Sequence, residues 1–372
     1  MSAENSTASL TCSNITMAAL DHVTKTAAFF DPVWHLAITI EYYFQHALLA
    51  IGVIGLASNA LVLYALITHN AQQAKKHAIN MLIIHQNSID LTCCVLLLLT
   101  YCVGDRMHLT GSLGYFICAV FISNSALYSA LHASVINLIT ITIERYLKIV
   151  HPFWSKKHLK RWMINAAMVF AWIAGIMFNV PVVISTMLLE DGLCRIYMTW
   201  ATPEGQVIFG TSVIVIFFVV PLVVFIYCYG RIIIVMRRQM CVMAGHNVEA
   251  GGSQANASQI RSKRIKWNIA KTMLTVSVVF IISWCPNNII YMISDHTSIT
   301  SHLIIGYYPT VFMIYLNVCL NPFIYATKHE GVKQKLADLL TRYKSKRQTD
   351  APGVSSNNGG GMQQTSAGIT HH

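Results

Sequence analysis

The adjacent residues Glu144 and Arg145 are the first candidates for chemistry in this chain, because they end a long apolar stretch within residues 134–152. The segment that follows them is basic. A charge at such a border is costly unless it is paired or faces a cavity, so an arginine there is a functional candidate by default. The stretch predicts a functional arginine where hydrocarbon gives way to water.

Asp90 is the one acidic residue that the sequence places deep within an apolar stretch. Polar residues of other apolar stretches could share its site, namely Ser134, Asn317 and Asn321. Oxygen-rich clusters of this kind suit hard cations such as Na⁺. The alternative is a protonated, hydrogen-bonded aspartic acid with a structural role, and the residue alone favours neither.

Three prolines, Pro221, Pro286 and Pro322, interrupt apolar stretches that otherwise predict helices. Each removes an intrahelical hydrogen bond and kinks the helix, which makes the last two plausible hinges beside bulky or polar neighbours. Asn59 predicts a structural hydrogen bond between helices, and Trp172 predicts a packing residue.

An enzyme is not indicated by any motif of the sequence, which has neither Gly-x-Ser-x-Gly nor His-Glu-x-x-His. His85 and His132 lie in apolar stretches, where a histidine is more often a hydrogen-bonded core residue than a metal ligand. Basic clusters at 156–161 and 261–266 adjoin apolar stretches, so they favour anionic lipid headgroups or a cytosolic protein over nucleic acid.

The elements that carry these residues are set by the composition of the chain. Of its 372 residues, 55% are hydrophobic and 11% are charged, whereas average soluble domains are about 25% charged. Seven apolar runs are each long enough to cross ~30 Å of hydrocarbon as a helix. They lie near 40–68, 77–104, 113–148, 161–187, 206–238, 264–295 and 302–327. The predicted fold class is an all-α membrane protein, a seven-transmembrane helix bundle.

The basic residues predict the orientation of these spans. All but three of the 26 Lys and Arg residues fall on the side of the first, third and fifth connections and the C-terminus. By the positive-inside rule we expect a multi-pass plasma-membrane protein with an extracellular N-terminus and an acidic outer face. The glycosylation triplets at Asn5 and Asn14 agree. Cys118 and Cys194 then both face the oxidising exterior, where we expect them to form a disulfide, and two free thiols are the alternative.

The predicted domains are an extracellular tail over 1–39, the seven-helix domain over 40–328, and two C-terminal segments. Residues 329–344 have apolar residues at helical spacing with basic residues between them, which predicts a short amphipathic helix on the inner leaflet. Residues 345–372 predict a disordered cytoplasmic tail. The stretch 243–258, rich in Gly, Ala, Asn and Ser, predicts a flexible inner loop.

The motifs, taken in order along the chain, resemble those of a rhodopsin-like (class A) G-protein-coupled receptor over roughly residues 40–345. They are Asn59, Asp90, Glu144-Arg145-Tyr146, Trp172, Pro221 with Tyr229, Ser283-Trp284-Cys285-Pro286, and Asn317 with Asn321-Pro322-Phe323-Ile324-Tyr325. The run from Trp284 to Asn288 is also similar, more weakly, to galanin, somatostatin and allatostatin receptors. The resemblance implies an extracellular ligand, activation of heterotrimeric G proteins, and binding of arrestin.

The resemblance also implies an activation switch, in which Glu144 holds Arg145 at rest and Pro286 lets the sixth span move outward. The switch residues that it implies are Glu144, Arg145, Tyr146, Tyr229, Trp284, Pro286, Asn321, Pro322 and Tyr325. The implied G-protein contacts are Arg145, Phe153 and Lys266. The residues Asp90, Ser134, Asn317 and Asn321 match the sodium pocket of the family, so Na⁺ becomes the expected ion there.

Two departures from the family pattern carry expectations of their own. Lys266 stands where the family usually has an acidic residue that holds the arginine at rest, so we expect basal signalling. Cys118 lies two residues further from Arg145 than usual, so a disulfide would need the outer end of the third span to be extended or bulged.

The ligand is constrained by two positions, since Leu127 stands where amine receptors carry Asp and Tyr315 where opsins carry Lys. The expected pocket residues are Tyr101, Leu127, Tyr128, Leu131, Asn287, Asn288, Tyr291, Tyr307, Val311 and Tyr315. An uncharged aromatic pocket below an acidic rim suits a peptide with a basic or amidated segment. A lipid, a neutral small molecule or a largely constitutive receptor is the alternative. A transporter would show repeats and paired intramembrane charges, and a membrane hydrolase would show a metal-binding cluster of His and Asp. The sequence shows none of these features, so both classes are disfavoured.

Overall fold

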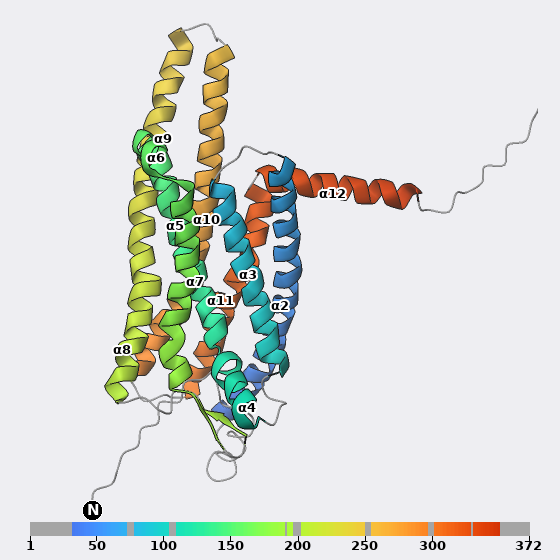
Figure 1. Ribbon diagram of the computed structural model, residues 1–372, viewed down its shortest axis with the longest axis vertical. Helices are drawn as coiled ribbons and strands as arrows, with labels where there is room; N and C mark the ends of the chain where they lie inside the picture. The colour runs from blue at the N-terminus through green and yellow to red at the C-terminus, as the bar shows by residue number, and fades with distance from the viewer. Residues whose placement is uncertain are drawn as a thin grey trace, which may run out of the picture.

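The computed structural model describes residues 32–72, 78–103, 109–189, 192–195, 202–249, 254–296, 301–328 and 330–349. Within these residues, seven helical segments are long and apolar enough to cross a membrane. They run side by side as one bundle (Figure 1). The predicted seven-helix, all-α fold is therefore confirmed.

The spanning segments follow the predicted apolar runs and extend several of them. They are α2 (Pro32–Gln72), α3 (Ala78–Val103), α4 (Gly111–Ile117) with η2 (Cys118–Ile122) and α5 (Ser125–Val150), α7 (Arg161–Ile184), α8 (Pro203–Ile214) with η3 (Val215–Val219) and α9 (Val220–Glu249), α10 (Gln254–His296), and α11 (Ser301–Lys328). Between and after them lie α6 (Pro152–His158), the antiparallel strands β1 (Met187–Leu188) and β2 (Cys194–Arg195), and α12 (Glu330–Thr349).

The third span is not one continuous α-helix. In η2 the chain forms a π-helical turn, in which Ser123 N–H bonds to Cys118 O at 2.9 Å. The helix then breaks at Asn124, a non-glycine residue in the left-handed region with a φ of 59°. A π-turn accommodates an extra residue within a helix. The unusual position of Cys118 required this end to be extended or bulged if a disulfide forms, and the break and the π-turn show that it is bulged.

Small residues set the closest approaches in the bundle. A Cβ added at Gly175 of α7 would lie 3.1 Å from Ala133 N of α5, so these two helices touch through their backbones. A Cβ at Gly55 of α2 would lie 2.5 Å from Cys319 Sγ and 2.7 Å from Cys94 Sγ. Such glycines allow membrane helices to pack closely, since lipid supplies little hydrophobic drive for association.

The kink at Pro322 is stabilised by a neighbouring helix. A proline at this position cannot donate to Val318 O, four residues earlier on α11. Asn59 Nδ2 of α2 lies 3.4 Å from that oxygen, and it also donates to Gly55 O at 2.9 Å. The prediction that Asn59 makes a structural hydrogen bond between helices is confirmed, and its purpose is to supply the donor that the proline lacks.

The prediction of a flexible inner loop over 243–258 is wrong for most of that stretch, which is helical. Helix α9 continues to Glu249 and α10 already begins at Gln254, and the two project together beyond the rest of the bundle (Figure 1). Extending an existing helix requires fixing only one residue at a time, so a weak loop-like composition does not stop it.

Helix α12 follows the seventh span, as predicted, and runs crosswise to the bundle in Figure 1. Its Val332 is fully buried, and the helix contacts α2 and α11. It ends at Thr349 rather than at residue 344, so the first residues of the predicted disordered tail are helical. The rest of that tail, and residues 1–31 of the predicted N-terminal tail, lie outside the described residues.

Candidate functional site

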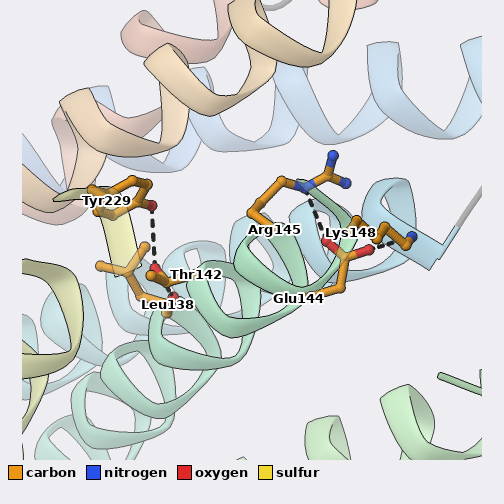
Figure 2. Close-up of polar contacts among 6 residues, drawn as sticks. All are labelled: Leu138, Thr142, Glu144, Arg145, Lys148 and Tyr229. Atoms are coloured by element: carbon orange, nitrogen blue, oxygen red, sulfur yellow. Dashed lines mark hydrogen bonds and ion pairs between the residues drawn. The ribbon is translucent and has the colours of Figure 1, made fainter. Parts of the chain in front are cut away.

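The charged residues at the C-terminal end of α5 form one cluster (Figure 2). Glu144 Oε2 lies 2.9 Å from Arg145 Nε, and Glu144 Oε1 pairs with Lys148 Nζ one helical turn further on. Glu144 and Arg145 are nearly fully buried, whereas the Lys148 side chain is 30% exposed. Two cations therefore share one buried carboxylate.

The contact between Arg145 and Glu144 is an ion pair without a well-aligned hydrogen bond. Their atoms are within 2.9 Å, yet Arg145 Nε has no hydrogen-bond partner of suitable angle among the described residues. The same holds for both oxygens of Glu144. A hydrogen bond weakens steeply as its angle falls towards about 120°. At Nε, charge attraction therefore holds Arg145 without the added strength of a well-aligned hydrogen bond.

Tyr229 of α9 takes part in a separate set of contacts. Its hydroxyl lies 3.2 Å from Thr142 Oγ1 and accepts a hydrogen bond from Ser277 Oγ of α10 at 3.4 Å. Figure 2 shows the guanidinium of Arg145 pointing away from this hydroxyl. Tyr229 thus joins α5, α9 and α10, while Arg145 stays with Glu144.

Other residues of the predicted switch carry buried polar atoms without partners. Tyr325 OH and Trp284 Nε1 have no hydrogen-bond partner among the described residues. The Trp284 ring lies 5.2 Å from that of Phe280. A buried polar group left unpaired costs about 1–3 kcal/mol, so both groups would gain from a rearrangement that supplied a partner. Tyr146 differs, because its hydroxyl lies 3.2 Å from His151 Nε2 near the surface.

Asp90 is fully buried in α3 and accepts three side-chain hydrogen bonds. Oδ2 accepts from Asn321 Nδ2 at 2.8 Å, and Oδ1 accepts from Ser134 Oγ at 3.3 Å and from Gln86 Nε2 at 3.1 Å. Three of the four residues predicted for this site therefore meet. The fourth, Asn317, is buried on α11, and its Oδ1 has no partner among the described residues.

Gln86 is the residue of this site that sequence reasoning missed. It is four positions before Asp90, so the two side chains lie on one face of α3. Gln86 Nε2 also lies 2.5 Å from Ser134 Oγ, and it therefore bridges the carboxylate and the hydroxyl. The i, i+4 spacing was the signal that could have identified it.

A chain of hydrogen bonds continues from Gln86 towards α7. Gln86 Oε1 accepts from Asn137 Nδ2 at 2.9 Å, Asn137 Oδ1 lies 2.9 Å from His85 Nδ1, and Trp172 Nε1 donates to His85 Nε2 at 3.1 Å. Trp172 packs against the core as predicted, and it also makes a hydrogen bond, since a buried indole N–H needs an acceptor. His85 and His132 are hydrogen-bonded core histidines as predicted, the latter through Asn179 Nδ2 at 3.0 Å.

The residues predicted to line a ligand pocket lie at the opposite end of the bundle. Tyr128 of α5 is hydrogen-bonded with Tyr307 and Tyr315 of α11 through their hydroxyls. Thr310 Oγ1 donates to Asn287 Oδ1 at 3.3 Å and so joins α11 to α10.

The remaining members of that set pack around these contacts. Leu127, Leu131 and Val311 are buried in the core, and Tyr101 packs against it. Asn288 Nδ2 donates to Trp284 O at 2.8 Å. A Cβ at Gly210 of α8 would lie 2.6 Å from Tyr291 Cε1, so the Tyr291 ring occupies space that this glycine leaves open. The structure gathers the predicted set, and ligand binding by it stays a prediction.

The disulfide between Cys118 and Cys194 is present, so the alternative of two free thiols is wrong. It joins η2 to β2 across a sequence separation of 76 residues. Because β2 pairs with β1, the connection between α7 and α8 is held against the end of the third span.

The predicted G-protein contacts lie at the end of the bundle opposite to the predicted ligand pocket. Phe153 is the second residue of α6 and is 90% exposed. Lys266 belongs to α10, but its side chain lies outside the described part of the structure. The glycosylation positions Asn5 and Asn14 also lie outside the described residues.

Comparisons with known proteins agree with this arrangement. The profile of the 7 transmembrane receptor (rhodopsin family) matches residues 58–325. Similar proteins include melanopsin-A of Gadus morhua, 28% identical over 86% of this chain and 53% of its own length. They also include the substance-K receptor of Bos taurus, at 24% over 84% of this chain and 77% of its own, and somatostatin receptor type 5 of Rattus norvegicus, at 22% over 82% and 80%. The chain thus spans about half the length of melanopsin-A.

Proposed function

Because the chain belongs to the rhodopsin family of seven-transmembrane receptors, we propose that it binds an extracellular peptide and activates heterotrimeric G proteins. The family consists of multi-pass plasma-membrane receptors rather than enzymes. One observation carries the proposal beyond the family. Arg145 is buried at the end of α5 against a carboxylate that it shares with Lys148, so a conformational change can release it.

The activation step follows from the contacts of Tyr229. Its hydroxyl accepts a hydrogen bond from Ser277, which lies on α10 nine residues before Pro286. If α10 moves outward about the kink at Pro286, the bond between Ser277 and Tyr229 breaks. Tyr229 then becomes available to Arg145, whose Nε contacts Glu144 as an ion pair without a well-aligned hydrogen bond. This exchange replaces the Glu144 contact with one between α5 and α9, and it opens the cytoplasmic end of the bundle.

The proposed G-protein surface lies at the same end. Phe153 exposes almost its whole side chain there, and a soluble partner could bury it. Helices α9 and α10 extend past the bundle on the same side (Figure 1). We include arrestin and anionic lipids as partners of this face, and place the N-terminus outside the cell.

A peptide ligand is favoured by the relatives and by the residues at the outer end. Receptors named for the peptides substance K and somatostatin are among the similar proteins. Leu127 replaces the acid expected of an amine receptor. Tyr315 replaces the lysine expected of an opsin, and its hydroxyl is engaged by Tyr128, so similarity to melanopsin-A does not favour a covalent chromophore here.

A largely constitutive receptor is the second candidate, and one observation favours it. The Tyr128 hydroxyl is hydrogen-bonded with those of Tyr307 and Tyr315, so these three hydroxyls have partners within the protein. Lys266 also stands where an acidic residue would restrain Arg145. This candidate predicts signalling in cells that receive no added ligand, and a lipid or neutral small molecule would act on the same uncharged set.

The test measures G-protein dissociation in cells that express the full chain, first without ligand and then with a panel of amidated peptides. We expect basal signal above mock transfection, and its loss in Arg145→Ala at equal surface expression. Arg195→Ala, which removes an arginine of β2 at the opposite end of the bundle, is the matched control and should signal without ligand as the wild type does. Full signalling by Arg145→Ala would overturn the mechanism, and a peptide that raises the signal would separate the two candidates.

A further inference from the structure

Gln86 occupies the position between Asp90 and Ser134 where a bound cation would bridge them. Its amide nitrogen lies 3.1 Å from Asp90 Oδ1 and 2.5 Å from Ser134 Oγ. Both oxygens are ones that the family resemblance assigns to a sodium ion. The side chain therefore presents N–H donors at the place where a cation would need oxygen ligands.

The orientation of the Gln86 amide is fixed from the far end of the hydrogen-bond chain. The Trp172 indole has a donor and no acceptor, so His85 Nε2 must accept and His85 Nδ1 must carry the proton. Nδ1–H then donates to Asn137 Oδ1, which leaves the Asn137 amide nitrogen to donate to Gln86 Oε1. With its oxygen committed, Gln86 can offer only its NH₂ group to Asp90.

Reversing this amide would require every link of the chain to reverse. If Gln86 turned its oxygen towards Asp90, its NH₂ group would meet the NH₂ group of Asn137. Asn137 would then have to turn as well, and His85 would need the other tautomer, which would place a second N–H opposite the indole. Because these groups are largely buried, the resulting donor–donor contacts could not be relieved by water.

The other side of the carboxylate is also closed by a donor. Asp90 Oδ2 accepts from Asn321 Nδ2 at 2.8 Å, so both carboxylate oxygens are already hydrogen-bonded. The amide oxygens of Asn317 and Asn321 have no partner among the described residues, but they do not replace the two oxygens that Gln86 bridges. The residues present therefore do not fit a sodium ion between Asp90 and Ser134.

We infer that the amide of Gln86 replaces the sodium ion expected at Asp90, so that the bundle is stabilised by a built-in donor and does not respond to Na⁺. Trp172, His85 and Asn137 are positioning residues, because they act on Asp90 only through Gln86. This inference does not depend on the ligand or on G-protein coupling. It can therefore stand or fall separately from the proposed function.

The experiment measures the melting temperature of the purified full chain in detergent, in NaCl and in choline chloride at equal ionic strength. We expect the same value in both salts for the wild type. In Gln86→Leu the bridging position opens, and Na⁺ should raise the melting temperature by about 3–5 °C in a saturable manner. The double variant Gln86→Leu/Asp90→Asn should lose this response. Ser88→Ala, which removes a hydroxyl that donates to Ile84 O of the same helix, should behave as the wild type does.

Two results would overturn the inference. One is a saturable, Na⁺-specific rise in the wild type that disappears in Asp90→Asn, since a cation would then bind beside Gln86. The other is a Gln86 variant that folds and shows no response to Na⁺, since Gln86 would then not be what excludes the ion. If Gln86→Leu does not fold, Gln86→Met gives the same readout, because methionine keeps the length of the side chain and has no N–H donor.

Discussion

The contact between Asn59 and Val318 gives the most direct quantitative test of how this bundle is held together. Pro322 deprives Val318 O of its helical donor, and the Asn59 amide lies 3.4 Å from that oxygen. Replacing Asn59 by alanine should therefore expose the cost of a freed carbonyl in a membrane helix. Interhelical hydrogen bonds in membrane proteins contribute about 0.6 kcal/mol on average and up to about 1.7 kcal/mol.

Asn59 also donates to Gly55 O and lies 3.8 Å from Cys94 Sγ, so the single variant loses more than one contact. A double-mutant cycle with Pro322→Ala isolates the contact of interest. The substitution Pro322→Ala restores a backbone N–H that can donate to Val318 O, and this bond would make the Asn59 donor redundant. The contacts with Gly55 and Cys94 are the same in both backgrounds and cancel.

The assay is equilibrium unfolding of the full chain in mixed micelles. Asn59→Ala should raise the unfolding constant roughly 3- to 20-fold more in the wild-type background than in the Pro322→Ala background. The long 3.4 Å distance places the expected value in the lower half of that range. Equal losses in the two backgrounds would refute the reasoning, because Asn59 would then not serve the carbonyl that the proline frees.

Three further outcomes follow from the packing. Gly210→Ala should lower the free energy of unfolding by about 1–3 kcal/mol, because its Cβ would overlap the Tyr291 ring, and adding Tyr291→Ala to this variant should restore stability. Gly230→Ala is the control, because a Cβ there meets nothing within 4 Å, and an equal loss in both glycine variants would contradict this account. Cys118→Ser should lower the free energy of unfolding by about 4.5 kcal/mol, because the disulfide closes a sequence separation of 76 residues. The loss is measured by melting temperature and surface expression, with Cys241→Ser, which removes an exposed free thiol, as the control. Phe153→Ala should leave the melting temperature unchanged, since the side chain is 90% exposed, while lowering G-protein activation, and unaltered activation would argue against Phe153 as a contact.

Most of the architecture could be predicted because its signals are local. Each apolar run is long enough to require a membrane helix, so the number and order of the spans follow from the sequence. The spacing between Cys118 and Arg145, two residues longer than usual, likewise predicted an extended or bulged end, and η2 and Asn124 form the bulge. Residues 243–258 were mispredicted because a composition rich in small and polar residues is a weak signal beside two long helices that continue into it.

The sequence by itself determined that this chain is a seven-helix membrane protein with an arginine and an aspartate at costly depths, because hydrophobicity and charge act residue by residue. It could not determine what those residues contact. The pairing of Arg145 with a carboxylate shared by Lys148, and the donor chain that begins at Trp172, depend on how the helices are rotated against one another. Gln86 shows the consequence, since its partners come from α3 and α5 and its amide orientation is fixed from α7. A hydrogen bond has a direction, and only the tertiary structure sets that direction.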